Sequence, residues 1–298
     1  MSKPIPLVKA GEVEYIERAN QACQGCAGAI VSRIVSKVLG PNAVRAEVAC
    51  CGPAFMNIKH PSIYAEVFEG AGALMTGISR GLRKIGRGDV VVYGIIGDGG
   101  TVDIGFQGLS AAAERNENIL WIVYDNEAYM NTGGQRSSST TPYAVTTTTP
   151  QGKLSRGKKE AKKSVPLMIA LHGVPYVATA SVSYPEDLMG KLEYAKNLRG
   201  FRFIHISAPC PTGWSYDPKD TIKVGRAMVQ SGLWPLFEVI DGKRFRITYK
   251  PKELKPVREV LKMQGRFRHV TEEEINEIQQ QVTSLWERLV EKDGGFLF

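Results

Sequence analysis

Two apolar segments that end in acidic residues constrain the fold of this chain more than any other feature. Residues 90–96 are largely apolar and lead into Gly97-Asp98-Gly99, and residues 119–124 lead into Asp125-Asn126. Such runs are typical of parallel strands that are buried on both faces. A helical segment, residues 105–117, separates them, so this stretch predicts one βαβ unit. Ligands bind where the carboxyl ends of such strands meet.

The ends of the two segments carry oxygen atoms that suit a hard cation. Mg²⁺ commonly binds few protein carboxylates and takes its other ligands from phosphate and water, which fits the side chains of Asp98 and Asn126. The glycines beside Asp98 would let a diphosphate approach the backbone closely. We therefore expect a magnesium–diphosphate site. The alternative is that residues 97–100 form only a tight turn between a strand and a helix.

The chain has five cysteines: Cys23, Cys26, Cys50, Cys51 and Cys210. A Cys-x-x-Cys pair can be half of a zinc site, a redox pair or part of an iron–sulfur site. A Cys₂His₂ zinc-finger pattern is absent, and a redox pair would need no further thiols. A [4Fe-4S] cluster needs four thiolates, which Cys23, Cys26, Cys210 and one of Cys50 and Cys51 could supply. Unrelated buried thiols are the alternative.

The two patterns together resemble one enzyme family. A Gly-Asp-Gly motif followed by an Asn about thirty residues later resembles the thiamine diphosphate-binding enzymes. With the cysteine spacing, nearly the whole chain resembles the β subunit of 2-oxoacid:ferredoxin oxidoreductases, the family of pyruvate:ferredoxin oxidoreductase. Further matching segments are residues 125–135, 141–143, 146–150, 208–214 and 232–238. The resemblance implies a three-layer α/β thiamine diphosphate-binding fold, with a mostly parallel sheet and a C-terminal arm.

The resemblance also implies roles for particular residues. Mg²⁺ would bind Asp98, the side chain of Asn126 and the carbonyl of Ala128, and Asn131 would face the substrate and the diphosphate as the catalytic residue. The cofactor-binding residues would be Gly97, Asp98, Gly99, Asn126, Ala128, Asn131, Thr132 and Gly133. The cluster ligands would be Cys23, Cys26, Cys51 and Cys210, because the spacing from Cys26 favours Cys51 over Cys50.

By resemblance, the enzyme carries out CoA-dependent oxidative decarboxylation of a 2-oxoacid, and passes electrons through the cluster to ferredoxin. Pyruvate is the expected substrate, because residues 68–73 lack the His-Gly-Arg segment of some relatives that act on larger substrates. Branched-chain and aryl 2-oxoacids and oxalate stay open. Activity would require an α subunit with a pyrimidine-binding domain, and γ and ferredoxin-like δ subunits or their equivalents. The alternatives are another type of thiamine enzyme and a non-catalytic metal-binding interaction subunit.

The formal net charge of +8 is concentrated in two basic segments, residues 153–163 and 243–268. No nucleic-acid recognition motif accompanies them, so we expect no nucleic-acid partner. They form either a solvated face or a surface that attracts acidic ferredoxin, CoA phosphates or acidic subunits. The chain has no apolar run long enough for a membrane span, and its free cysteines favour the cytoplasm.

We expect two parts in the chain. Residues 1–231 would form the thiamine diphosphate- and cluster-binding domain, and residues 232–298 a C-terminal extension that packs on a partner subunit or on its own domain. Residues 272–292 have the apolar spacing of an amphipathic helix. Residues 130–150 are rich in Gly, Ser and Thr without apolar periodicity, which predicts a functional loop whose hydroxyls line a phosphate channel or lie at the surface.

Overall fold

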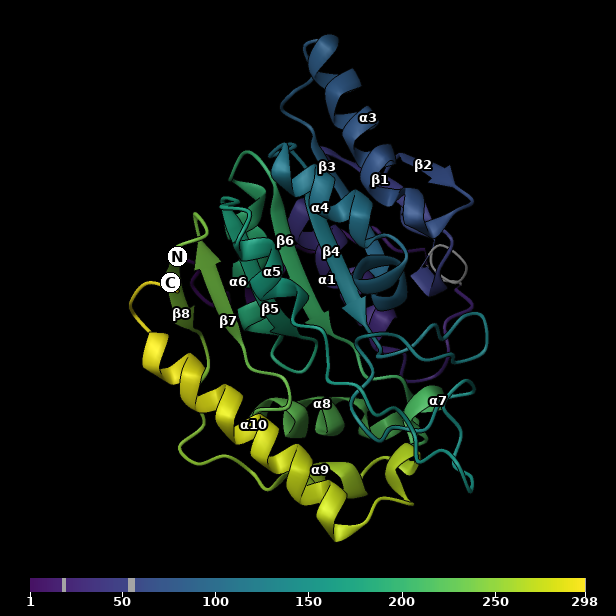
Figure 1. Ribbon diagram of the computed structural model, residues 1–298. Coiled ribbons are helices and arrows are strands. Elements are labelled where there is room, and N and C mark those ends of the chain that lie inside the picture. The colour runs from purple at the N-terminus through teal and green to yellow at the C-terminus, as the bar shows by residue number, and fades with distance from the viewer. Residues whose placement is uncertain (18–19, 53–56, 298) are drawn as a thin grey trace.

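The computed structural model describes residues 1–17, 20–52 and 57–297. Within these residues, eight strands form one sheet in the order β2–β1–β3–β4–β6–β5–β7–β8 (Figure 1). Strands β1 to β6 are parallel to one another, and β7 and β8 are antiparallel to their neighbours. The strands are β1 (Ala43–Val48), β2 (Ser62–Ala65), β3 (Val91–Gly97), β4 (Leu120–Asp125), β5 (Tyr176–Ser181), β6 (Arg202–Ser207), β7 (Phe237–Ile240) and β8 (Arg244–Ile247).

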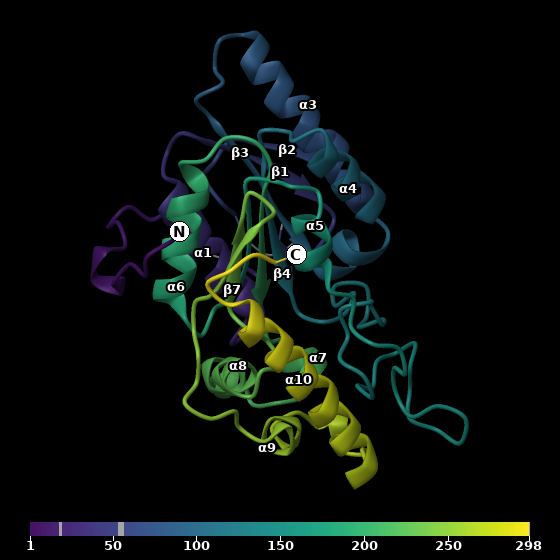
Figure 2. The same cartoon turned by 60° about the vertical axis from the view of Figure 1, so that its left-hand side comes forward.

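Helices cover both faces of the sheet, as the edge-on view in Figure 2 shows. Helices α1 and α6 pack on one face, and α3, α4, α5 and the end of α10 pack on the other. The helices are α1 (Ala27–Leu39), α3 (Ala71–Lys84), α4 (Phe106–Glu114), α5 (Val165–Ala170), α6 (Pro185–Lys196), α7 (Pro211–Trp214), α8 (Thr221–Gln230), α9 (Val257–Lys262) and α10 (Glu272–Lys292). The predicted three-layer α/β fold with a mostly parallel sheet is therefore confirmed.

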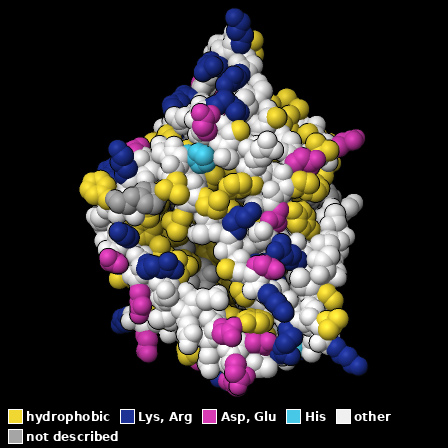
Figure 3. Space-filling view, in the orientation of Figure 1, with side chains coloured by type: hydrophobic (Ala, Val, Ile, Leu, Met, Phe, Trp, Pro, Cys, Tyr) yellow, Lys and Arg dark blue, Asp and Glu magenta, His cyan; other side chains and the backbone are white. Residues whose placement is uncertain are grey.

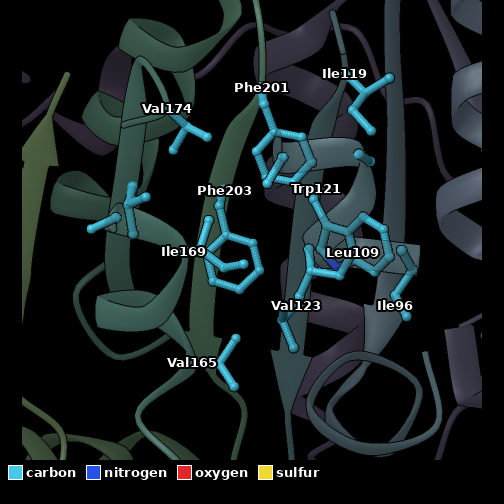
Figure 4. Packing of buried hydrophobic residues seen from close by; sticks show 14 of the residues in the cluster. Ile96, Leu109, Ile119, Trp121, Val123, Val165, Ile169, Val174, Phe201 and Phe203 are labelled. Carbon is cyan, nitrogen blue, oxygen red and sulfur yellow. The ribbon is translucent and has the colours of Figure 1, made fainter. Parts of the chain in front are cut away.

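The central strands are apolar along their whole length because they bury both faces. Successive side chains point to opposite faces of a strand, so Leu120 and Ile122 pack against the layer of α1 and α6. Trp121 and Val123 pack in the opposite layer, where they meet Phe203 of β6 (Figure 4). This double burial explains why the segments that form β3 and β4 read as continuous apolar runs rather than alternating ones.

Strand register brings the functional segments to one edge of the sheet. Gly97 at the end of β3 pairs with Tyr124, and Asp125 at the end of β4 pairs with Ser207 of β6. The residues that follow these strands therefore lie side by side. They include Asp98, Asn126 and Cys210. Helices α7, α8 and α9 lie beyond this edge (Figure 1).

The C-terminal segment joins the same sheet. Strands β7 and β8 extend it, and Leu289 of α10 packs in the core cluster that contains Phe237 and Phe245. Helix α10 has the predicted bounds, and a capping box between Thr271 and Glu274 fixes its start. The packing of residues 232–298 on a partner subunit stays a prediction. Among the described residues, none of the helices combines the length and apolar composition needed to cross a bilayer.

Helices α3 and α4 touch through glycine backbones, which gives a stability prediction. A Cβ atom built on Gly72 would lie 2.4 Å from the carbonyl oxygen of Gly108, so we expect Gly72→Ala to lower the free energy of unfolding by about 1–3 kcal/mol. Gly77 lies on the same helix with no atom within 4 Å of its added Cβ. There Ala should stabilise by up to about 1 kcal/mol. Denaturant unfolding measures both effects, and equal effects would contradict the close contact.

Candidate cofactor site

Two adjoining cavities lie at the carboxyl edge of the sheet. The smaller, of about 80 Å³, lies against β3 and β4 and contains most of the predicted cofactor-binding residues: Gly97, Asp98, Gly99, Asn126, Ala128, Asn131 and Thr132. The larger, of about 550 Å³, is lined by Cys23, Cys26, Cys51, Cys210 and Gly133. Residues Cys51, Asn126, Ala128 and Asn131 line both cavities. The two predicted sites therefore share a wall.

Three polar groups converge in the smaller cavity with the spacing of cation ligands. One of the two terminal atoms of the Asn126 side-chain amide lies 2.8 Å from the Ala128 carbonyl oxygen and 3.0 Å from Asp98 Oδ1. With nitrogen at that position, the amide donates two hydrogen bonds; with oxygen there, three oxygens face one another. Neighbouring oxygens around an octahedral Mg²⁺ lie about 3 Å apart, since the bonds are about 2.1 Å long. The donor set and these two distances therefore fit Mg²⁺.

The carboxyl group of Asp98 lies deep in the protein. It is fully buried, and Ser137 donates a hydrogen bond to its Oδ2 atom. Burial, followed by the nearby charge of Asp125, raises the pKa of Asp98 well above its ordinary value. A buried carboxylate of this kind is stable as an anion when a cation neutralises it. A cation bound at Asp98 would therefore displace a proton.

Gly99 of the Gly-Asp-Gly motif makes room for an aromatic ring. A Cβ atom at this position would lie 2.4 Å from the ring of Tyr129. The hydroxyl of Tyr129 donates a hydrogen bond of 3.0 Å to the Gly99 carbonyl oxygen. The glycine thus allows the segment after β4 to close against the segment after β3. The contact with Tyr129 is therefore a second reason for glycine at position 99. The first is the expected close approach of a diphosphate.

The serine- and threonine-rich loop holds the acidic strand ends. Ser137 donates to Asp98, Ser139 to Asp125, and Thr141 to Glu127. These three hydroxyl residues are buried. The predicted alternatives were a phosphate channel and an exposed surface. For these three residues the structure shows a third arrangement, in which they hydrogen-bond to buried carboxylates.

Glu127, which the sequence patterns did not single out, is the centre of a buried ion cluster. Its carboxylate lies 2.6 Å from Lys162 Nζ and 2.8 Å from Arg266, and Thr141 donates to it at 2.8 Å. Burial alone raises the pKa of Glu127, but the charges of Lys162 and Arg266 outweigh burial and lower it to about 2. Glu127 is therefore ionised throughout the neutral range. The only feature of the sequence that could have pointed to Glu127 as a functional residue was its position next to Asn126.

The four predicted cluster ligands line one cavity, whereas Cys50 points elsewhere. Cys50 Sγ lies 3.9 Å from the carbonyl oxygen of Ile95, beneath the end of β3. Burial, with the neighbouring Cys50, Cys210 and Cys26, raises the pKa of Cys51 to about 12. Cys26 and Cys210 precede helices α1 and α7 directly. Among the described residues, no three His, Cys, Asp or Glu side chains are close enough together to hold a metal ion, so the thiols surround the cavity without being drawn together.

Two lysines of the first basic segment, residues 153–163, turn inward, whereas Lys153 and Lys159 are exposed. Lys158 is buried and donates to the Thr140 carbonyl oxygen at 2.7 Å, and Lys162 pairs with Glu127. These two charges do not belong to a solvated face.

Figure 3 shows Lys and Arg side chains gathered at the top of the molecule. The end of α3, which carries Arg80, Arg83 and Lys84, lies at the top in the same orientation (Figure 1).

The fold, a mostly parallel sheet between two layers of helices, is the α/β fold of thiamine diphosphate-dependent enzymes. The family model described as "Thiamine pyrophosphate enzyme, C-terminal TPP binding domain" matches residues 59–206. The chain is 47% identical to pyruvate synthase subunit PorB of Methanothermobacter marburgensis, over 95% of this chain and 99% of the relative. It is 44% identical to ketoisovalerate oxidoreductase subunit VorB of Pyrococcus abyssi, over 90% of each. The chain therefore belongs to the PorB/VorB family of subunits of thiamine diphosphate-dependent 2-oxoacid:ferredoxin oxidoreductases.

A solved structure agrees with this fold. The 2-oxoglutarate:ferredoxin oxidoreductase from Magnetococcus marinus superimposes with a TM-score of 0.57 at 21% sequence identity, over 73% of this chain and 82% of that one. At this identity the likeness concerns the fold alone. It supports the layer arrangement.

Proposed function

We propose that this chain is the subunit of a pyruvate:ferredoxin oxidoreductase that binds Mg²⁺–thiamine diphosphate and one [4Fe-4S] cluster. The shared wall between the two cavities carries the proposal, since it puts Asp98, Asn126 and Ala128 next to the cavity of Cys23, Cys26, Cys51 and Cys210. When bound, thiamine diphosphate supplies the carbon nucleophile and electron sink for decarboxylation, and the cluster accepts electrons.

The chain's own residues divide the work between the two cavities. Asp98, Asn126 and Ala128 would hold Mg²⁺, which would supply positive charge for the diphosphate. Asn131 lines both cavities, so it is placed to orient a substrate between them. The four cysteines bind iron, and the high pKa of Cys51 means that cluster assembly displaces its proton.

The family resemblance implies that a carboxylate from a different domain or subunit hydrogen-bonds the aminopyrimidine of the cofactor, and we propose that a partner subunit supplies it. Among the described residues that line the two cavities, Asp98 and Glu127 are the only carboxylates. Asp98 belongs to the proposed metal site, and Glu127 is held by Lys162 and Arg266. Neither is free to contact the pyrimidine. This arrangement supports an active centre that is completed by an α subunit. By the family resemblance, we also propose γ and ferredoxin-like δ subunits, or their equivalents, that pass electrons on to ferredoxin.

The dependence on partners gives the main test of this function. We expect the isolated chain to show no CoA-dependent 2-oxoacid oxidation, and the complex purified without oxygen to oxidise pyruvate with CoA and a low-potential acceptor. Iron analysis and cofactor extraction on the same sample test the two sites. Robust pyruvate oxidation by the chain alone would overturn the proposed division of the active centre.

The substrate is tested separately, because the PorB and VorB relatives are similarly close in sequence. We propose pyruvate, and the specific alternative is a branched-chain 2-oxoacid, the class that the name ketoisovalerate oxidoreductase indicates for VorB. Steady-state rates with pyruvate, 2-oxoisovalerate, an aryl 2-oxoacid and oxalate distinguish these. A higher kcat/KM for 2-oxoisovalerate than for pyruvate would assign the chain to the VorB branch.

A further inference from the structure

We infer that Glu127 is a positioning residue that holds the magnesium-ligand positions Asn126 and Ala128 by pairing with Lys162 and Arg266. The inference rests on the proposed function and adds a requirement to it. It makes two further segments necessary for metal binding: the basic loop, residues 153–163, which carries Lys162, and the C-terminal segment, residues 232–298, which carries Arg266.

The backbone at Glu127 requires external support. Its φ angle is +63°, in the left-handed region that residues other than glycine rarely adopt. Glu127 lies between Asn126, whose side chain points toward Asp98, and Ala128, whose carbonyl oxygen lies beside that side chain. A turn of this kind persists when the surrounding contacts over-determine it. The contacts of Glu127 are therefore the place to look for that support.

Every polar group of Glu127 is engaged. Its backbone N–H donates to Asp125 Oδ1 at 2.8 Å, and its carbonyl oxygen accepts from Thr140 at 2.6 Å. Its carboxylate is 1% exposed and lies between the two cations. A buried carboxylate with two close cations has a strong preference for one position. This preference fixes the peptide units that lead to Asn126 and Ala128.

The two cations are themselves held by aromatic rings. Lys162 Nζ lies 4.5 Å from the ring centre of Trp234, and the guanidinium of Arg266 lies 3.9 Å from that of Trp214. Trp214 Nε1 in turn donates to the Asn126 carbonyl oxygen at 2.8 Å. Arg266 thus stabilises the metal-binding turn twice, through Glu127 and through Trp214. Trp214 also ends the short helix that begins after Cys210, so the same contacts connect the metal turn to the cysteine-bearing loop.

A matched ion pair separates positioning from general stability. Arg156 and Glu274 also join the basic loop to the C-terminal segment, but this pair is partly exposed and neither residue lines the two cavities. Glu274→Gln is therefore the control for Glu127→Gln, and Arg156→Gln is the control for Lys162→Gln. A purely structural role predicts similar consequences for both pairs.

The experiment measures metal binding in the intact complex rather than activity. Each variant is titrated with Mn²⁺ in the presence of thiamine diphosphate, with calorimetry for affinity and EPR for the symmetry of the metal site. We expect Glu127→Gln and Arg266→Gln to weaken Mn²⁺ binding at least tenfold and to broaden the EPR signal. Arg266→Lys, which keeps the charge, should recover part of the affinity, and the two control variants should stay within twofold of the wild type.

The outcomes separate this inference from the proposed function. Wild-type affinity and spectrum in Glu127→Gln would overturn the positioning role and leave the proposed function intact, whereas a wild-type complex that binds no Mn²⁺ with thiamine diphosphate would overturn the proposed function. If the Glu127→Gln complex does not assemble, the Mn²⁺ affinity of the Lys162→Gln complex tests the inference instead. Its Lys is partly exposed, and a threefold or larger loss supports the inference. Equal losses in Lys162→Gln and Arg156→Gln would refute it.

Discussion

Replacing Asp98 with Ala is expected to abolish thiamine diphosphate binding to the assembled complex. The diphosphate would lose the cation that bridges it to the protein, and Asn126 and Ala128 cannot bind Mg²⁺ with a neutral donor set alone. We expect a loss of at least about a hundredfold in affinity, which corresponds to about 2.7 kcal/mol. Calorimetry with Mg²⁺ present measures it.

A second aspartate, at the end of the short helical segment that follows Asp98, provides the control. Asp103 lies a few residues further along, where it accepts a hydrogen bond from the Ser138 backbone at 2.9 Å and is not among the residues that line the two cavities. Asp103→Ala should keep the affinity within a few-fold of the wild type. Unchanged affinity in Asp98→Ala, or an equal loss in both variants, would refute the metal site.

The same carboxyl group sets the direction of the pH dependence. Burial and Asp125 raise the pKa of Asp98 in the metal-free protein, so the group holds a proton at a pH at which an exposed aspartate would not. Mg²⁺ must displace this proton. Affinity for Mg²⁺–thiamine diphosphate should therefore fall as the pH is lowered, and binding should release protons in calorimetry with buffers of different ionisation enthalpy.

Replacing Cys51 with Ser is expected to remove the iron–sulfur cluster, whereas Cys50→Ser should keep it. The two cysteines are adjacent, but Cys51 lines the cavity of Cys23, Cys26 and Cys210. Cys50 does not line that cavity and lies near the Ile95 carbonyl oxygen. A thiolate ligand cannot be replaced by a hydroxyl without a large loss in iron affinity, because iron–sulfur clusters are held by thiolates.

Iron content and the EPR spectrum of the reduced complex measure this difference. Cys50→Ser is the matched control, since it makes the same chemical change one residue away. Loss of iron in Cys50→Ser with an unaltered cluster in Cys51→Ser would reverse the assignment. Retention of the cluster in both single variants would show that the two thiols replace one another.

Local patterns in the sequence were sufficient for strands β3 and β4, for the long C-terminal helix and for the Gly-Asp-Gly and Asp-Asn segments at the ends of those strands. The runs before Asp98 and Asn126 are apolar throughout because each strand is covered on both faces, and that requirement acts on every residue of the run. The bounds of α10 follow from its apolar period and its Thr271 cap. Parallel strands end at a common edge, so the meeting of Asp98 and Asn126 also followed from local information.

Contacts between distant segments were decided only by the tertiary structure. Lys162 and Arg266 meet at Glu127, and nothing in the residues around either cation distinguishes it from the exposed Lys153 or Lys159. Whether a Lys or Arg side chain is buried depends on finding a carboxylate in another part of the fold, since an unpaired charge cannot remain inside.

Strands β7 and β8 are also too short to carry a clear pattern, and join the sheet through pairing with β5. By itself the sequence determined the motifs and the edge at which they meet; the fold decided which charges hold them in place, because burial and ion pairing depend on neighbours that are remote along the chain.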